Sequence, residues 1–204
     1  HHVGKRCLYS FCMCPGGQVV AAASEAGGVL TNGMSLHARD GKNANAAVAV
    51  SVSPDDFGND ALRAMEFQRT LEQKAFAAGG GGYAAPAENV QSFLKGEGKL
   101  TLTSVQPTYP RGVAAASLGA LLPDELAETL RTGLAAFERK LRGYTAPEAV
   151  LTGLETRTSG PIRLARGEDF VSKDVSGLYP CGEGAGYAGG IMAAGVDGVR
   201  VASA

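Results

Sequence analysis

Apolar positions along the chain follow two periods, the two-residue alternation of strands and the 3.6-residue spacing of helices. Short apolar runs bounded by turn residues predict strands over residues 6–12, 18–23, 44–53, 149–156, 160–165 and 177–181. Helical spacing predicts four helices, which begin near Asn59-Asp60, at Pro86, at Pro123 and near Gly189. The sequence therefore predicts a mixed α/β (α+β) fold.

The clearest helix is predicted over residues 123–142. Its apolar stripe consists of Leu126, Leu130, Leu134, Phe137 and Leu141. Acidic residues at its start and basic residues at its end interact favourably with the helix dipole, so we interpret it as a structural helix.

The last predicted helix is built from small residues, and Ile191, Ala194, Gly198 and Val201 share one face of it. Glycine inside a helix costs about 1 kcal/mol relative to alanine. This composition predicts a helix pressed closely against a sheet or a ligand. The run at residues 44–53 is continuously apolar and predicts a buried strand.

The end of the chain carries the most informative pattern, a predicted strand at residues 177–181, a glycine-rich turn and the start of the last helix. Glycines let a ligand approach the backbone, and the free N–H groups of a helix start attract negative charge. Glu183, at the strand end, can accept hydrogen bonds from hydroxyls. This combination suits a flavin dinucleotide, and the candidate cofactor-binding residues are Gly182, Glu183, Gly184, Gly186, Gly189, Gly190 and Ile191.

Composition narrows the classes of function. The net charge is −1 and the Lys and Arg residues are dispersed, which does not support nucleic-acid binding. No apolar run reaches the length of a membrane span and no secretory pattern opens the chain, so we expect a cytoplasmic protein without a membrane partner. Four cysteines are too few for a disulfide scaffold.

Two of these cysteines, Cys12 and Cys14, would face the same side of a strand. Two interpretations have equal weight: thiols beside a redox cofactor, hence candidate catalytic residues, or small buried core residues. Neither a second pair of cysteines nor a histidine pair accompanies them, so we predict no metal site.

Two polar loops supply further candidates. Residues 31–45 contain Arg39 and Asn43 as candidate substrate-binding residues, although Asn, Asp and Gly also serve ordinary turns. Residues 153–163 contain Arg157, a candidate catalytic residue, and Arg163, a candidate substrate-binding residue. Their guanidinium groups could hold a carboxylate, a phosphate or a flavin carbonyl edge, or the loop could be a solvated hairpin.

Several ordered motifs, YSFCMCPGG, NGMSLHARDGKNAN, LETRTSGPIR and GLYPCGEGAGYAGGIMAAGVDGVRVA, carry a resemblance over nearly the whole chain. The sequence resembles the C-terminal part of the uncharacterised FAD-dependent dehydrogenase/oxidoreductase family, which are two-dinucleotide-binding-domain flavoproteins. The resemblance implies that residues 1–165 are a substrate-side inserted domain with a mixed sheet and helices. Residues 166–204 would then be the last strand and helix of a Rossmann-like FAD-binding domain.

A dinucleotide-binding domain normally opens with a strand, a G-x-G-x-x-G segment and a helix, but no such segment opens this chain, and His1-His2 lead directly into a strand-like segment. We therefore expect that the other half of the FAD domain precedes this chain in a longer protein and is its partner. The predicted function is a C-terminal fragment of an FAD-dependent oxidoreductase of unknown small-molecule substrate, inactive on its own. The alternative is a non-catalytic binding or structural module that folds without flavin.

Overall fold

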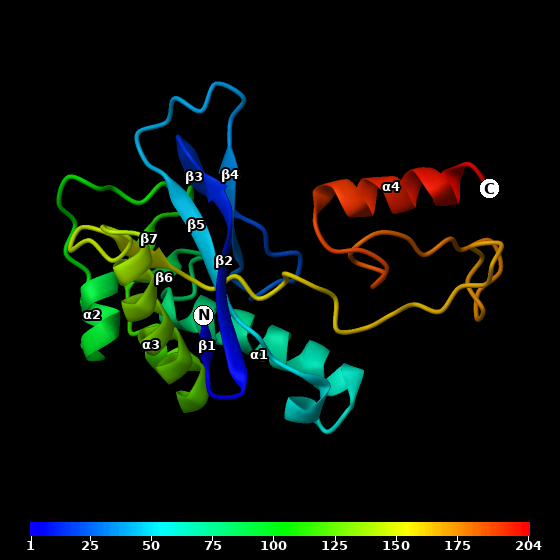
Figure 1. Ribbon diagram of the computed structural model, residues 1–204, viewed down its shortest axis with the longest axis horizontal. Coiled ribbons are helices and arrows are strands. Elements are labelled where there is room, and N and C mark those ends of the chain that lie inside the picture. The colour runs from blue at the N-terminus through cyan, green and yellow to red at the C-terminus, as the bar shows by residue number, and fades with distance from the viewer. The chain divides into compact units, whose positions relative to one another are not determined.

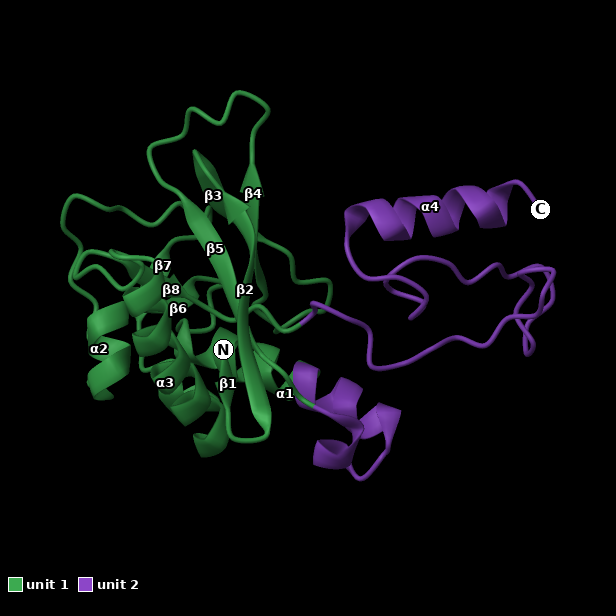
Figure 2. Cartoon of the chain, in the orientation of Figure 1, with its two compact units in different colours: residues 1–52, 69–156 green, residues 53–68, 157–204 purple.

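The computed structural model describes all residues, 1–204, and divides them into two compact units. Unit 1 comprises His1–Val52 and Arg69–Thr156, and unit 2 comprises Ser53–Gln68 and Arg157–Ala204 (Figure 2). Strands and helices are both present, and the predicted mixed α/β class is confirmed.

Unit 1 contains three small sheets (Figure 1). The first is antiparallel in the order β1-β2-β5, and its strands are β1 (His2–Val3), β2 (Arg6–Cys14) and β5 (Asn45–Val50). The second pairs β3 (Gly17–Ala21) with β4 (Thr31–Ser35). The third has the order β7-β6-β8, with β6 (Ala85–Asn89) parallel to β7 (Val113–Ala115) and antiparallel to β8 (Val150–Thr152).

Four α-helices and two short 3₁₀ helices complete the chain. They are η1 (Pro54–Phe57), α1 (Ala61–Ala78), α2 (Val90–Lys95), η2 (Gly119–Leu121), α3 (Asp124–Lys140) and α4 (Ile191–Ala202). The predicted start of α1 is confirmed, because the Asp60 carboxylate accepts the N–H of Leu62 at 2.9 Å as an N-cap. The prediction that Pro86 opens a helix was wrong. Pro86 lies in β6, and the helix begins at Val90.

The predicted apolar stripe of α3 forms part of the core of unit 1. Leu134 is 2% exposed and packs in one cluster with Phe93 and Leu118. Leu141, by contrast, lies beyond the end of the helix and is exposed. A second cluster joins Ala75 of α1 with Val29, Ala85 and Tyr109.

Two strands of unit 1 differ from expectation. The strand predicted as buried, β5, is only half-buried along its whole length, because it pairs with β2 on one side and keeps the other edge open. In β2 a bulge interrupts the register between Phe11 and Cys14, and Cys12 takes a positive φ of 46°. Strict alternation of side chains therefore ends before the cysteine pair.

The part of unit 2 between residues 157 and 190 is irregular apart from one bridge between Arg166 and Ser172. The strands predicted at residues 160–165 and 177–181 do not form. A strand needs a neighbouring strand for its backbone groups, and here isolated hydrogen bonds, such as Leu164 N–H to the Ala185 carbonyl, take that place.

The helix predicted near Gly189 is confirmed as α4, but its expected close packing is not seen. Ile191 is 86% exposed, and nothing lies within 4 Å of a Cβ built on Gly195 or Gly198. Of the shared face, only Val201 is buried. None of the helices combines the length and apolar character that a membrane crossing requires.

Candidate functional site

The glycine-rich turn of unit 2 is tied to α4 by an ion pair between Arg166 and Asp197. Both guanidinium Nη atoms reach the carboxylate, at 2.7 and 2.9 Å, and both side chains are largely buried. The same carboxylate accepts the N–H of Gly182 at 2.9 Å, and Arg166 also donates to the Pro180 carbonyl at 2.7 Å. Asp197 therefore fixes the start of the turn to the middle of the helix.

These contacts change the acidity of both groups. The hydrogen bond from Arg166, followed by that from the Gly182 N–H, lowers the pKa of Asp197 from 3.8 to about 2. The hydrogen bond to Asp197 raises the pKa of Arg166. Asp197 is thus a carboxylate at any physiological pH, and its charge is matched within unit 2.

A second set of contacts holds the far side of the turn. Arg163 donates from Nε to the Gly186 carbonyl at 3.0 Å and lies over the Tyr187 ring, as does Arg166. The Tyr187 hydroxyl donates to the Leu164 carbonyl and accepts a hydrogen bond from the backbone N–H of Arg166, both at 3.0 Å. Gly186 has φ of 80°, and a Cβ there would come within 2.5 Å of the Ile162 carbonyl oxygen, so only glycine fits.

Glu183 lies at the N-terminus of α4. Its Oε2 accepts the N–H of Gly190, the N-cap residue, at 3.2 Å. No side chain caps the next N–H groups of the helix, and Gly190 has φ of 83°. A Cβ built on Gly184, Gly189 or Gly190 would meet nothing within 4 Å, so this stretch of backbone is open to a ligand.

The predicted thiol pair lies in unit 1, at the bulged end of β2. Cys12 is exposed, Cys14 is half-buried, and neither forms a disulfide. Met13, between them, is 58% exposed.

The turn after β2 contacts the polar loop before β5. Gly17 donates its N–H to the Asn43 carbonyl at 2.7 Å, and a Cβ on Gly16 would strike the Arg39 carbonyl. The Asn43 amide donates to the Gln106 carbonyl at 2.7 Å, so this donor is already used within the protein. The structure thus brings Cys14, Arg39 and Asn43 to one edge of unit 1, whereas Arg157 and Arg163 belong to unit 2.

Comparison with known proteins identifies the family. Residues 1–158 match the family described as FAD-dependent protein, C-terminal domain-like. The chain belongs to this family. It is also 54% identical over 199 residues to an uncharacterized protein of Clostridium beijerinckii (strain ATCC 51743 / NCIMB 8052), an alignment that covers 97% of this chain and 37% of that relative. The chain therefore spans well under half the length of the relative that it matches.

Membership of an FAD-dependent family makes the fit of unit 2 to a flavin the relevant test. The open glycine backbone and the uncapped helix start fit the close approach of a polar ring edge. The Glu183 carboxylate fits hydroxyl groups of the cofactor, and it disfavours a phosphate at the same position because like charges repel. The residues present therefore fit the ribityl and ring portion of FAD better than its pyrophosphate.

Sequence reasoning missed the residues that shape this site, Arg166, Tyr187 and Asp197. Asp197 is the only acidic residue of α4, whose other residues, Arg200 apart, are apolar or small, which is a usable indication of a buried partner. Its partner, 31 positions earlier, could not be chosen from the several arginines of the region.

Proposed function

We propose that this chain is the C-terminal part of an FAD-dependent oxidoreductase, a dehydrogenase of a small-molecule substrate, and that residues 182–191 bind the flavin in the intact protein. The observation that carries the proposal is the meeting of a carboxylate, Glu183, with the uncapped N-terminus of α4 on an open glycine backbone. Family membership supports the choice of FAD over other polyol ligands.

Each part of the turn has a distinct task in this proposal. Glu183 keeps one oxygen on Gly190 and offers the other to ribityl or ribose hydroxyls. The free N–H groups at the start of α4, from Ile191 onward, face the electron-rich edge of the ring and stabilise negative charge there. Bound flavin supplies hydride-transfer chemistry, for which the protein provides orientation and electrostatics.

The remaining candidates complete the proposal. Cys12 and Cys14 as catalytic thiols, Arg157 as a catalytic cation, and Arg39, Asn43 and Arg163 as substrate ligands remain predictions from the sequence. The exposure of Cys12 supports accessibility to a reactant. The Asn43–Gln106 hydrogen bond favours a supporting role for Asn43, since its amide donor is engaged.

The domain assignment is part of the same proposal. Residues 1–165 form the substrate-side domain, and residues 166–204 complete an FAD domain whose other half lies elsewhere in the intact protein. The exposed apolar residues of α4, Ile191, Met192, Val196 and Val199, support this assignment because they offer an apolar face for that half.

The test is the FAD affinity of the intact protein carrying Glu183→Gln. Glutamine keeps an acceptor for Gly190 and removes the charge, and hydrogen bonds to charged groups contribute about 1.5–3 kcal/mol. We expect FAD to bind roughly 10- to 100-fold more weakly, measured by quenching of flavin fluorescence. Glu168→Gln, an exposed acid of the same unit, is the matched control and should leave the affinity unchanged. Equal affinities of the two variants would contradict the proposal and favour a module that functions without flavin.

A further inference from the structure

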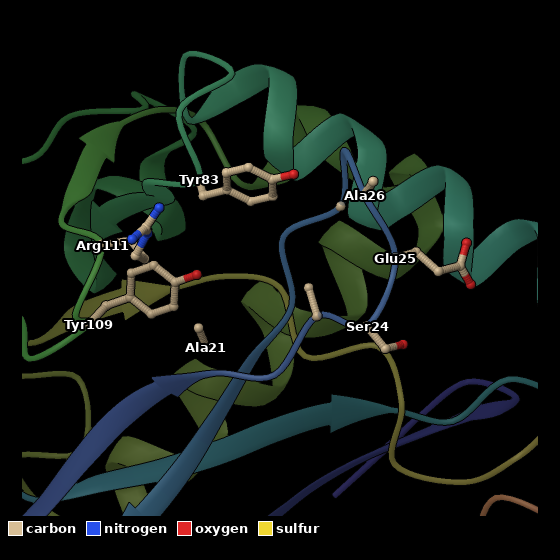
Figure 3. Close-up of a pocket in the computed structure, with 9 residues that line it drawn as sticks. Ala21, Ser24, Glu25, Ala26, Tyr83, Tyr109 and Arg111 are labelled. Carbon is tan, nitrogen blue, oxygen red and sulfur yellow. The ribbon is translucent and has the colours of Figure 1, made fainter.

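A cavity of about 400 Å³ opens in unit 1, and none of the residues assigned to the flavin lines it (Figure 3). It lies between the end of β3 with its following loop, the turn after α1, and the segment before β7. Its volume falls within the range of small-molecule sites, about 300–1,000 Å³.

Tyr109 places an unpartnered hydroxyl in this cavity. Its ring is 5% exposed and packs with Val29, Ala75 and Ala85, which accounts for the apolar part of the side chain. The hydroxyl forms no hydrogen bond with the protein, and Figure 3 shows it directed into the open space of the cavity. The hydroxyl oxygen is accessible from the cavity rather than sealed in the core, so it can donate a hydrogen bond to a ligand there.

Two more donors lie beside it. Arg111 lies between Tyr83 and Tyr109 in Figure 3, forms no ion pair, and is the only cationic residue that lines the cavity. The Tyr83 oxygen accepts the N–H of Gly27 at 3.2 Å, which leaves its own O–H free to donate. Burial raises the pKa of Tyr109 against the opposing effect of Arg111, so its hydroxyl keeps the proton that it would donate.

The opposite wall is largely apolar. Ala21, Ala23 and Ala26 present methyl groups, and Ser24 adds one hydroxyl. Glu25 also lines the cavity, but its carboxylate is paired with Arg69 at 2.8 Å. A ligand must therefore combine an apolar body with one negative group, and a phosphate dianion would face a single cation and a nearby carboxylate.

We propose that this cavity binds a small organic monocarboxylate. Its carboxylate accepts hydrogen bonds from Arg111 and the Tyr109 hydroxyl, and its apolar body lies against the Tyr83 ring and the alanine methyl groups. Arginine is well suited to this task, because its planar donor array matches a carboxylate.

Benzoate is the probe, titrated into the intact protein by isothermal calorimetry. We expect saturable binding with Kd of about 1 mM or below. Arg111→Gln and Tyr109→Phe should each weaken it roughly 10-fold or more, and Arg139→Gln, an exposed arginine of α3, should not change it. The melting temperature of ligand-free Tyr109→Phe protein should not fall, which shows that the fold is intact.

Three outcomes would overturn the proposal. The first is that binding of benzoate to the intact protein does not saturate. The second is that the Arg111→Gln and Tyr109→Phe proteins bind benzoate with the same Kd as the unsubstituted protein. Binding of neutral benzamide or of inorganic phosphate with the affinity of benzoate would exclude carboxylate recognition. Unlike the Glu183 test, none of these outcomes depends on bound FAD.

Discussion

Gly133 lies in the middle of α3, where the helix packs against Leu8 of β2. A Cβ at this position would come within 2.8 Å of the Leu8 Cβ and 2.9 Å of its Cγ, and Leu8 is fully buried. We predict that Gly133→Ala lowers the free energy of unfolding by up to about 2 kcal/mol. Overpacking of about 1–3 kcal/mol outweighs the gain of about 1 kcal/mol in helix propensity. Hydrogen exchange of the α3 amides in the 204-residue chain measures the change.

Gly195 of α4 is the matched control, because nothing lies within 4 Å of the Cβ that alanine would add. Gly195→Ala should therefore protect the α4 amides by about 0.5–1 kcal/mol. Loss of α4 protection in the Gly195→Ala chain would show that α4 packs differently from the arrangement described. Unchanged α3 protection in the Gly133→Ala chain would show the same for α3.

At the scale of elements, the link between the 180–190 turn and α4 depends on ionised Asp197. Its pKa is lowered from 3.8 to about 2, so the folded state binds the proton less tightly than the unfolded state. The contribution of this group is fully present above pH 3.8 and is lost as the pH falls toward about 2. We predict that α4 protection falls in this window, and that Asp197→Asn lowers protection at neutral pH and removes the dependence.

The pKa of Asp197 is measured directly by following its carboxyl resonance by NMR as the pH is lowered. Asp174 is an exposed acid of the same unit, so Asp174→Asn should leave the pH dependence of α4 protection unchanged. A midpoint near the ordinary value for an aspartate would contradict the ion pair with Arg166.

At the scale of the whole molecule, the chain spans only 37% of the length of its Clostridium beijerinckii relative. The proposed contacts of residues 182–191 reach hydroxyls and one ring edge. The one G-x-G-x-x-G match of this chain, residues 184–189, falls inside this segment and follows no strand, so no separate glycine loop is left for the pyrophosphate. We predict that the purified 204-residue chain binds FAD weakly or not at all, and that the intact protein binds it stoichiometrically. The visible absorption of both proteins after incubation with FAD tests this. A yellow 204-residue chain with one flavin per molecule would refute the domain assignment.

The sequence by itself determined the mixed class and the three longer helices. Helical hydrogen bonds join residues four apart, so a local cap such as Asp60 and a local stripe such as that of α3 suffice to define them. The family resemblance was equally readable, and the match over residues 1–158 confirmed it.

Only the tertiary structure decided which strands form and which side chains meet. The partner of β2 is β5 rather than the adjacent β3, and the apolar run at residues 177–181 finds no strand to pair with. Arg166 reaches Asp197 across 31 positions, and the Tyr109 hydroxyl is left without a partner beside Arg111. Strand pairing and site geometry depend on contacts between distant residues, whose choice rests on packing of the whole unit rather than on any local pattern.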